Sequence, residues 1–384
     1  MDAETAIKLE AEYLNSCYDR FQLLIKKGKG SYLLDSEGKK YLDFVSGVAT
    51  SSLGHSNPAL KKCLAEAFDE FSSVSNLFYQ EKQILLAQKL SGLTGLSNCF
   101  YSNSGAEAVE AAIKLARIHT GKKEIISTIN GFHGRTFGAL SATGKKAIKE
   151  KFEPLVPHFI HILYNDTSAL EKAISSNTAA FIIEPIQGEA GIIIPSPDYL
   201  KEASELCSDK GVLLIADEVQ TGMWRTGKFL ASQWENIEPD ILCMAKGLAG
   251  GFPLGVTMSK DAINFSKGDH GSTFGGNNIA CSMALATLDF AEKKKLGLNA
   301  AKLGKRLEKG LVAIQKPQII EVRVKGLMAG IETGTEAKKY SLNCITNGLL
   351  VSVCQEKTLR LLPPLTVKAS EVDEAVGILE KAIQ

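Results

Sequence analysis

The sequence predicts an α/β fold with a large domain on a mainly parallel sheet and a smaller α+β domain built from both chain ends. In the middle of the chain, short apolar runs alternate with helical patterns over some two hundred residues. Such alternation is typical of a parallel sheet with helices on both faces. The flanking regions lack this alternation. A chain of 384 residues with 45% hydrophobic content can bury a large core and should form about two domains.

The N-terminal flank predicts a hairpin within residues 30–45, because two apolar runs surround the turn Ser36-Glu37-Gly38. Residues 98–102 predict the first strand of the large sheet. The Ala, Val and Ile face of residues 106–117 predicts the helix that follows it. Further apolar runs predict strands at 123–127, 158–163, 179–184, 212–217 and 240–244, with one of the intervening helices at 199–210.

From about residue 281 onward, long helices precede a strand-like segment at 326–332. We therefore expect residues 1–45 to form an N-terminal arm and part of the small domain. Residues 46–280 are expected to form the large domain, and residues 281–384 the rest of the small domain.

Charge and cysteine content narrow the class of protein. The chain has 44 basic and 43 acidic residues, so no nucleic-acid or anionic-membrane partner is indicated. Its eight cysteines include no CxxC pair, which favours buried reduced thiols over disulfides or zinc. The acidic start lacks the apolar core of a signal peptide, and no apolar run reaches the length of a membrane span. We expect a cytoplasmic protein.

The strongest candidates for catalytic residues lie at the ends of two predicted strands. The apolar run 241–245 delivers Lys246 to a glycine-rich turn, and the run 212–216 delivers Asp217. A lone lysine at such a junction is more often a surface residue. However, a buried amine tends to lose its proton and can then form a Schiff base with an aldehyde. Ligands bind beyond the carboxyl ends of parallel strands. Together the two residues suggest pyridoxal phosphate, with Lys246 on its aldehyde and Asp217 on its pyridine nitrogen.

Other segments supply a possible pocket lining. Small residues at 102–106 precede a helix whose N-terminus can bind an anion, although Ser-Gly there is also an ordinary helix cap. Phe132 could stack on an aromatic ring or belong to the core. Glu184 and Glu189 follow another strand, and a polar turn at 270–277 offers hydroxyl groups to a phosphate.

Together these segments resemble the class III pyridoxal-phosphate aminotransferases, and most closely their acetylornithine aminotransferase branch. The resemblance runs from about Tyr18 to the end of the chain. Its specific pieces, in matching order and spacing, are Asn103-Ser104-Gly105-Ala106-Glu107-Ala108, Phe132-His133-Gly134-Arg135-Thr136, Glu184-Pro185-Ile186-Gln187-Gly188-Glu189, Asp217-Glu218-Val219-Gln220-Thr221-Gly222, Ala245-Lys246-Gly247 and Gly271-Ser272-Thr273-Phe274-Gly275-Gly276-Asn277. It implies a fold-type-I pyridoxal-phosphate transferase with a seven-stranded sheet, and a homodimer with shared active sites.

The resemblance also implies roles around the cofactor. Lys246 is expected to hold pyridoxal phosphate covalently and to move the proton, and Asp217 to pair with the ring nitrogen. Phe132 is expected to stack on the ring, and Gln220 to contact the region of its oxygen. The expected phosphate ligands are Ser104, Gly105 and Ala106, with Thr273 reaching over from the other subunit.

The substrate residues follow from the same resemblance. Arg135 and Arg360 match two arginines that bind carboxylates, for which the planar guanidinium is suited. Glu189 matches the acid that masks the second arginine until 2-oxoglutarate needs it. Tyr18 aligns with a tyrosine at the substrate entrance, and Ser272 is expected to line the substrate site. No metal is expected.

One residue that differs from the ornithine aminotransferases bears on the identity of the amino donor. Val48 stands where those enzymes carry a tyrosine that meets the free α-amine of ornithine. An aliphatic side chain tolerates an acylated amine, which favours N2-acetylornithine as the donor in arginine biosynthesis. Trp224 and Val324 replace the glycines usual in the branch and leave the acyl group and chain length open. Acetyl-lysine (with a role in lysine biosynthesis), succinylornithine and carrier-linked substrates therefore stay as options.

Ornithine and 4-aminobutyrate aminotransferases are the nearest alternatives, and an aminomutase such as glutamate-1-semialdehyde mutase shares the fold but needs no second amino acceptor. No GxGxxG motif follows a predicted strand, which disfavours a dinucleotide-dependent dehydrogenase. His158 and His161 point to opposite faces of an extended stretch, which disfavours a metal site. Every expected catalytic position is filled, which disfavours a non-catalytic binding protein.

Overall fold

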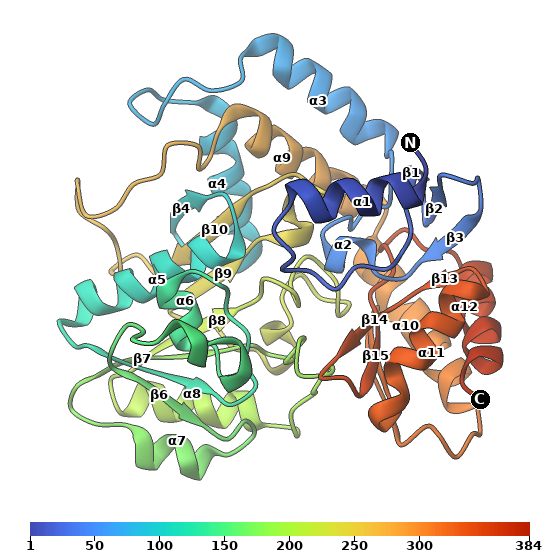
Figure 1. Cartoon of the computed structure of the whole chain (residues 1–384). Coiled ribbons are helices and arrows are strands. Elements are labelled where there is room, and N and C mark those ends of the chain that lie inside the picture. Colours follow the sequence, from blue (N-terminus) through green and yellow to red (C-terminus); the bar gives the residue numbers. More distant parts are fainter.

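A seven-stranded sheet forms the centre of the molecule in the computed structural model, which describes all residues 1–384 (Figure 1). Its strands, in spatial order, are β4 (Asn98–Ser102), β10 (Gly255–Ser259), β9 (Ile241–Met244), β8 (Leu213–Asp217), β7 (Thr178–Ile183), β5 (Glu124–Thr128) and β6 (Phe159–Ile162). Only β10 runs antiparallel to its neighbours. The predicted mainly parallel sheet is confirmed, whereas β10 had not been predicted.

Helices cover both faces of this sheet because successive strand residues point to opposite sides. Ile125, Ile182 and Ile215 pack with α5 (Gly105–Thr120) on one face. Their neighbours Ile126, Phe181 and Leu214 pack with α7 (Thr167–Ala173) and α8 (Tyr199–Asp209) on the other. Burying each Leu, Ile or Phe side chain stabilises the folded state by about 1.5–3 kcal/mol relative to leaving it exposed. Because helices cover both faces, consecutive residues of each strand are buried, which explains why the strands are continuous apolar runs in the sequence. The short helix α6 (Phe137–Ala142) lies between β5 and β6 in the chain.

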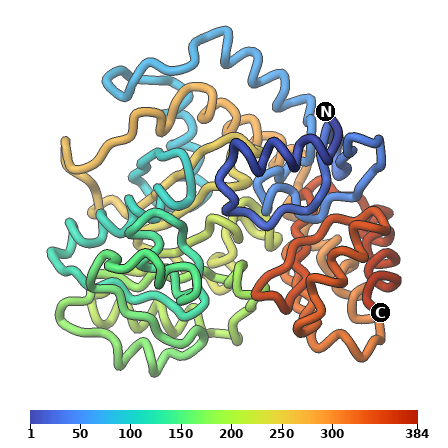
Figure 2. The backbone as a smooth tube through the Cα atoms, in the orientation of Figure 1, coloured from blue at the N-terminus to red at the C-terminus, as the bar shows by residue number.

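Two four-stranded sheets lie outside the central one. The first contains β1 (Ile25–Lys29), β2 (Tyr32–Asp35), β3 (Lys40–Asp43) and β13 (Leu349–Leu350) in that order. The predicted hairpin is present as the antiparallel pair β2–β3. The parallel pairing of β3 with β13 joins the N-terminal and C-terminal parts of the chain, and the backbone trace shows the blue and red parts next to each other (Figure 2).

The second small sheet has the order β11-β12-β15-β14, formed by β11 (Glu321–Lys325), β12 (Met328–Glu332), β15 (Thr358–Leu361) and β14 (Ser352–Cys354). The helices in this region are α10 (Leu296–Val312), α11 (Ala337–Thr346) and α12 (Ala369–Ala382). The strand-like segment expected at 326–332 corresponds to β12, in a sheet with three other strands that the sequence had not indicated. The predicted domain limit at residue 280 falls within α9 (Asn278–Lys293), and the division into domains stays a prediction.

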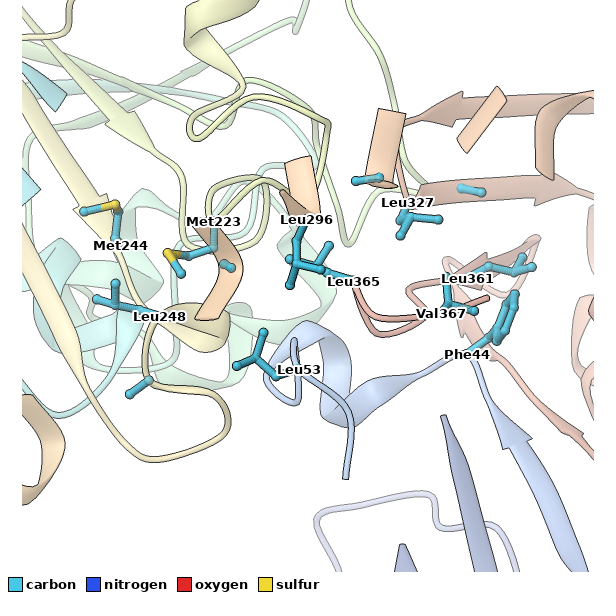
Figure 3. Close-up of a cluster of buried hydrophobic side chains, with 14 of the residues drawn as sticks. Phe44, Leu53, Met223, Met244, Leu248, Leu296, Leu327, Leu361, Leu365 and Val367 are labelled. Atoms are coloured by element: carbon cyan, nitrogen blue, oxygen red, sulfur yellow. The ribbon is translucent and has the colours of Figure 1, made fainter. Parts of the chain in front are cut away.

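One apolar cluster connects the central sheet to the small sheets. Met244 at the end of β9 and Leu248 belong to it, as do Phe44 and Leu361 from the small sheets (Figure 3). All four are at most 1% exposed. This shared core fixes the turn that carries Lys246 relative to the strand that carries Arg360.

The remaining helices belong to the N-terminal quarter: α1 (Ala3–Tyr13), α2 (Ser46–Ala49), α3 (Pro58–Glu70) and α4 (Glu81–Thr94). Asp2 begins α1 by accepting the Thr5 N–H at 2.8 Å, and no residue of this helix is buried. No helix in the chain has both the length and the apolar character that a membrane crossing requires.

Candidate active site

A cavity of about 250 Å³ lies beyond the carboxyl ends of β8 and β9. Eleven residues line it, and seven of them are predicted site residues: Gly105, Ala106, Phe132, Arg135, Asp217, Gln220 and Lys246. A wider groove of about 1110 Å³ lies at the opposite ends of these strands, near Val212 and Asp240. Charged groups of both signs line that groove, and it contains none of the predicted site residues. The smaller cavity is therefore the candidate active site.

Lys246 enters the cavity from the turn after β9. Its backbone has a positive φ of 41°, which is uncommon for a residue with a side chain and typical of functional turns. The Ser52 hydroxyl holds this turn by donating to the Gly247 carbonyl at 2.9 Å. Burial lowers the pKa of the Lys246 amine, although Glu189 opposes the effect. The neutral, nucleophilic form of the amine is thereby favoured.

Asp217 is oriented by two neighbours. Its Oδ2 atom lies 2.7 Å from Nδ1 of His133, and its Oδ1 atom accepts the Val219 N–H at 3.1 Å. Burial alone would lower the pKa of His133, but the hydrogen bond to Asp217 and the charges of Asp217 and Glu184 together outweigh it, and the pKa is raised. The Nε2 atom of His133 is buried without a partner. Sequence reasoning assigned no role to His133, whose only signal was its place beside Phe132.

Glu184 connects two parts of the lining. Its Oε1 atom accepts the Phe132 N–H at 2.8 Å, and its Oε2 atom accepts the Gly188 N–H at 3.1 Å. Burial raises the pKa of Glu184 to about 7; Asp217 adds to this effect, while His133 opposes it. This carboxylate fixes both the aromatic residue and the start of the loop that carries Glu189. Its role was also missed, because nothing in the sequence indicates these contacts.

The start of α5 forms one end of the cavity. The Ser104 hydroxyl begins the helix by accepting the Glu107 N–H at 3.2 Å. The backbone N–H groups of the first turn point away from the helix and favour an anion. A Cβ atom on Gly105 would lie 2.7 Å from the Val219 side chain, so glycine permits the close approach seen here.

Arg360 and Glu189 form a buried ion pair next to this cavity. The Arg360 side chain is 4% exposed and that of Glu189 31% exposed. Ser352 orients the guanidinium by accepting from its Nε atom at 3.1 Å. Burial alone would raise the pKa of Glu189, but the charge and hydrogen bond of Arg360, with smaller effects of Lys246 and Gln220, together outweigh it, and the pKa is lowered. The pair is also close enough to Lys246 to affect the pKa of its amine.

Seven predicted residues are outside the cavity lining. Ser104, Glu189 and Arg360 adjoin the cavity as described above, and the other four are Tyr18, Val48, Ser272 and Thr273. Tyr18 is 70% exposed, and its ring lies 4.9 Å from the Arg20 guanidinium. Val48 packs against an apolar cluster that includes Ile186 and Ile192. Ser272 accepts the Gly275 N–H at 3.0 Å, and Thr273 is exposed on the same loop. None of these four lines the cavity that Lys246 enters in the single chain.

Trp224 and Val324, which replace the glycines usual in the acetylornithine branch, pack against the apolar cluster that connects the central sheet to the small sheets. Trp224 makes an edge contact with Phe229 at a centroid distance of 4.9 Å. Neither residue lines the cavity. His161, half of the histidine pair considered above, has its Nε2 atom 3.0 Å from the Lys149 ammonium. An imidazole with a cation at that distance is poorly suited to bind a metal ion.

The lining of the cavity fits pyridoxal phosphate. An amine, a carboxylate fixed by His133, an aromatic side chain and a helix N-terminus all face the same space. These are the groups that an aldehyde, a pyridine nitrogen, an aromatic ring and a phosphate require.

Comparisons with known proteins agree with this arrangement. Residues 13–383 match the model of the family described as aminotransferase class-III. The chain is 42% identical to an acetylornithine aminotransferase of Methanosarcina acetivorans over 99% of this chain and 96% of that protein. It is 43% identical to one of Archaeoglobus fulgidus over 97% and 99% of the two chains.

Solved structures give the same result. An ornithine aminotransferase of Toxoplasma gondii superposes with a TM-score of 0.97 at 33% identity, covering 100% of this chain and 95% of that one. An acetylornithine aminotransferase of Elizabethkingia anophelis superposes with a TM-score of 0.90 at 36% identity, covering 100% and 99%.

Proposed function

The chain belongs to the class-III aminotransferases, which use pyridoxal phosphate, and on that premise we propose that it transfers the ω-amino group of N2-acetylornithine, or a close acylated analogue, to 2-oxoglutarate. The products are the corresponding semialdehyde and glutamate. The Glu189–Arg360 ion pair beside Lys246 carries the proposal. While the carboxylate neutralises the arginine, the pocket can accept a donor that has only one carboxylate. When the carboxylate moves away, the same pocket can accept an acceptor that has two.

One group of residues is proposed to bind the cofactor. When bound, pyridoxal phosphate supplies the aldehyde and the electron-withdrawing ring. Asp217, held by His133, pairs with the ring nitrogen, Phe132 covers the ring, and Gln220 contacts the region of its oxygen. The α5 start, with Ser104, Gly105 and Ala106, binds the phosphate. Binding energy gained there comes from outside the reacting centre.

Lys246 and the two arginines act on the substrates. The Lys246 amine would hold the cofactor through its aldehyde, and as a free amine it can move a proton as general acid and base. Arg135, at the exposed rim of the cavity, binds the α-carboxylate of the donor. Arg360 binds a carboxylate of 2-oxoglutarate after Glu189 turns away. Planar guanidinium groups suit both tasks.

An acylated donor is favoured by Val48 and by the relatives. Val48 packs among Ile186, Ile192 and other apolar residues, so it offers no hydrogen bond to a free ammonium group. Curated relatives at 41–43% identity bear the name acetylornithine aminotransferase. These observations favour a place in arginine biosynthesis, with acetyl-lysine and lysine biosynthesis as the neighbouring option. The second candidate is ornithine itself, since an ornithine aminotransferase superposes with a TM-score of 0.97.

We further propose a homodimer with shared active sites. Leu77, Phe78 and Tyr79 are 87%, 66% and 98% exposed in one chain, an unusual concentration of apolar surface. Asn76 ties this segment to the loop of Thr273 by donating to the Ser272 carbonyl at 3.0 Å. In this arrangement Thr273 reaches the phosphate of the partner, and the partner covers Tyr18 and Ser272. Eight unpaired cysteines are consistent with a cytoplasmic enzyme.

A donor panel tests the proposal. The purified enzyme is assayed with 2-oxoglutarate and, in turn, N2-acetylornithine, ornithine, N2-acetyl-lysine, succinylornithine and 4-aminobutyrate. We expect the highest kcat/KM for an acylated donor, with one glutamate formed per semialdehyde. Preference for free ornithine or 4-aminobutyrate would refute the assigned donor. Absence of glutamate would instead favour an aminomutase.

A further inference from the structure

Glu189 lies on a narrow loop, residues 187–193, whose base is closed by backbone hydrogen bonds. Gln187 and Ile193 exchange two such bonds, at 3.1 and 3.0 Å. The Gln187 side chain fixes the base to the end of β5 by donating to the Thr128 hydroxyl at 3.0 Å and the Ile129 carbonyl at 2.9 Å. One side of the loop is thereby attached to the central sheet.

The tip of the loop rests on the small sheet that carries Arg360. The Nε atom of Arg323, on β11, donates to the Gly191 carbonyl at 3.1 Å. Gly191 has a φ of +113°, and a Cβ atom there would lie 2.7 Å from the Thr358 hydroxyl. The backbone next to Glu189 is therefore in close contact with β15.

Arg323 is itself held in place. Its side chain is 9% exposed and forms ion pairs with Glu321 and with Glu332, the latter at 2.6 Å. The Thr358 hydroxyl donates to the same Glu332 carboxylate at 3.1 Å. Thr358 precedes Arg360 by two positions on β15, and alternate residues of a strand share a face. A polar network thus connects the loop tip to the strand of the ion-paired arginine.

We propose that Arg323 is a positioning residue that holds the 187–193 loop against β15, so that Glu189 leaves Arg360 by rotation of its side chain while the loop stays closed. The inference rests on the proposed function, because the exchange of Glu189 for a substrate carboxylate belongs to that function. With the backbone held at Gln187 and Gly191, the Glu189 side chain is the part left free to move. Its 31% exposure gives it room to do so.

The guanidinium group is essential to this role. Arg323 donates from Nε to the loop and from Nη2 to Glu332 at the same time. A lysine has one donor nitrogen and cannot span both partners in this geometry. Arg323→Lys should therefore keep the charge while loosening the loop, and Thr358→Val should weaken the same network more mildly.

The experiment measures glutarate binding to the holoenzyme by calorimetry. Glutarate carries the two carboxylates of 2-oxoglutarate but cannot react. If the anchored loop keeps Glu189 on Arg360, Arg323→Lys should tighten glutarate binding by about three- to tenfold, the range for loss of one hydrogen bond. The KM for 2-oxoglutarate should fall and that for the donor should rise. Amide hydrogen exchange in residues 187–193 should accelerate, which gives a readout independent of activity.

Two further variants make the outcome decisive. Arg306→Lys, at an exposed ion pair with Asp373, should leave glutarate binding unchanged. Glu189→Gln should tighten it, because the competing charge is gone. If Glu189→Gln has no such effect, the exchange at Arg360, and the inference with it, is wrong. If Glu189→Gln tightens binding but Arg323→Lys and Thr358→Val leave it unchanged or weaken it, only the role of Arg323 is overturned.

Discussion

The Nδ1 atom of His133 lies 2.7 Å from the Oδ2 atom of Asp217, and both side chains are buried. The two residues are 84 positions apart in the chain and meet across the carboxyl ends of the central strands. Because the imidazole fixes one carboxylate oxygen and the Val219 N–H the other, Asp217 presents a single orientation to the cavity.

The charge on His133 should stabilise the fold in a pH-dependent way. His133→Gln can retain a hydrogen bond but has no charge. The raised pKa of His133 means that its contribution is fully present below the unfolded pKa of about 6.5 and is lost as pH rises through the folded value. We expect the variant to lose about 1–3 kcal/mol of unfolding free energy at pH 5.5 and less at pH 8.5. Urea unfolding of the cofactor-free protein measures this, and a difference independent of pH would contradict it.

Lys246→Ala should abolish turnover, because no other amine lines the cavity. Borohydride reduction of the native holoenzyme, followed by peptide mapping, should place the cofactor on the peptide that contains Lys246. Lys260→Ala is the matched control, since Lys260 forms a half-exposed ion pair with Asp240 and should be dispensable. Labelling of any other lysine would refute the assignment.

Arg135→Ala and Arg360→Ala should damage different half-reactions. Loss of Arg135 removes the partner of the donor carboxylate, and we expect about 1.5–3 kcal/mol less stabilisation in the donor half. Loss of Arg360 should act mainly on the 2-oxoglutarate half. Single-turnover kinetics separate the two halves. Equal damage to both by Arg135→Ala would show that the carboxylates are assigned wrongly.

Val48→Tyr should shift the preference from acetylornithine toward ornithine, because its hydroxyl can meet a free ammonium group and its ring crowds an acetyl group. Val48 has a φ of 59°, where a β-branched side chain is unfavourable, so an unbranched residue should not add backbone strain. The ratio of kcat/KM for the two donors measures the shift. Val45→Tyr serves as a neighbouring control, and an unchanged ratio in Val48→Tyr would remove Val48 from the specificity site.

Thr273→Ala should weaken cofactor retention by about 0.5–3 kcal/mol, the range for one hydrogen bond to a neutral or charged group. Thr273 is exposed in the single chain, so the effect should appear only in the dimer. Cofactor affinity is measured by equilibrium dialysis, together with sedimentation to follow assembly. A monomer with full activity would contradict the shared site.

The sequence predicted the central sheet and the positions of Asp217 and Lys246 because continuous apolar runs end just before those residues. It did not predict β10, a short strand after a glycine-rich turn, nor the sheet of β11, β12, β15 and β14. The strands of that sheet have three to five residues each, and burial does not alternate along them, so local patterns reveal little about them.

The site was less predictable than the sheet. Contacts such as His133 with Asp217 and Arg323 with Gly191 depend on tertiary packing that no local pattern encodes. The run of positive φ values from Ser46 to Ala49 likewise includes one glycine only, so residue type gave no warning of it.

The pairing of β4 with β10 affects how the chain matures on the ribosome. Ser102 and Gly255 are partners in register although the intervening segment makes up much of the protein. At elongation rates of about 5–20 residues per second, β4 waits roughly 8–30 s for its neighbour. Throughout that interval its edge is open to non-native association, which a chaperone would prevent. Because Lys246 precedes Gly255 by nine positions, the nascent chain cannot hold its cofactor covalently before about two-thirds of its 384 residues have been made.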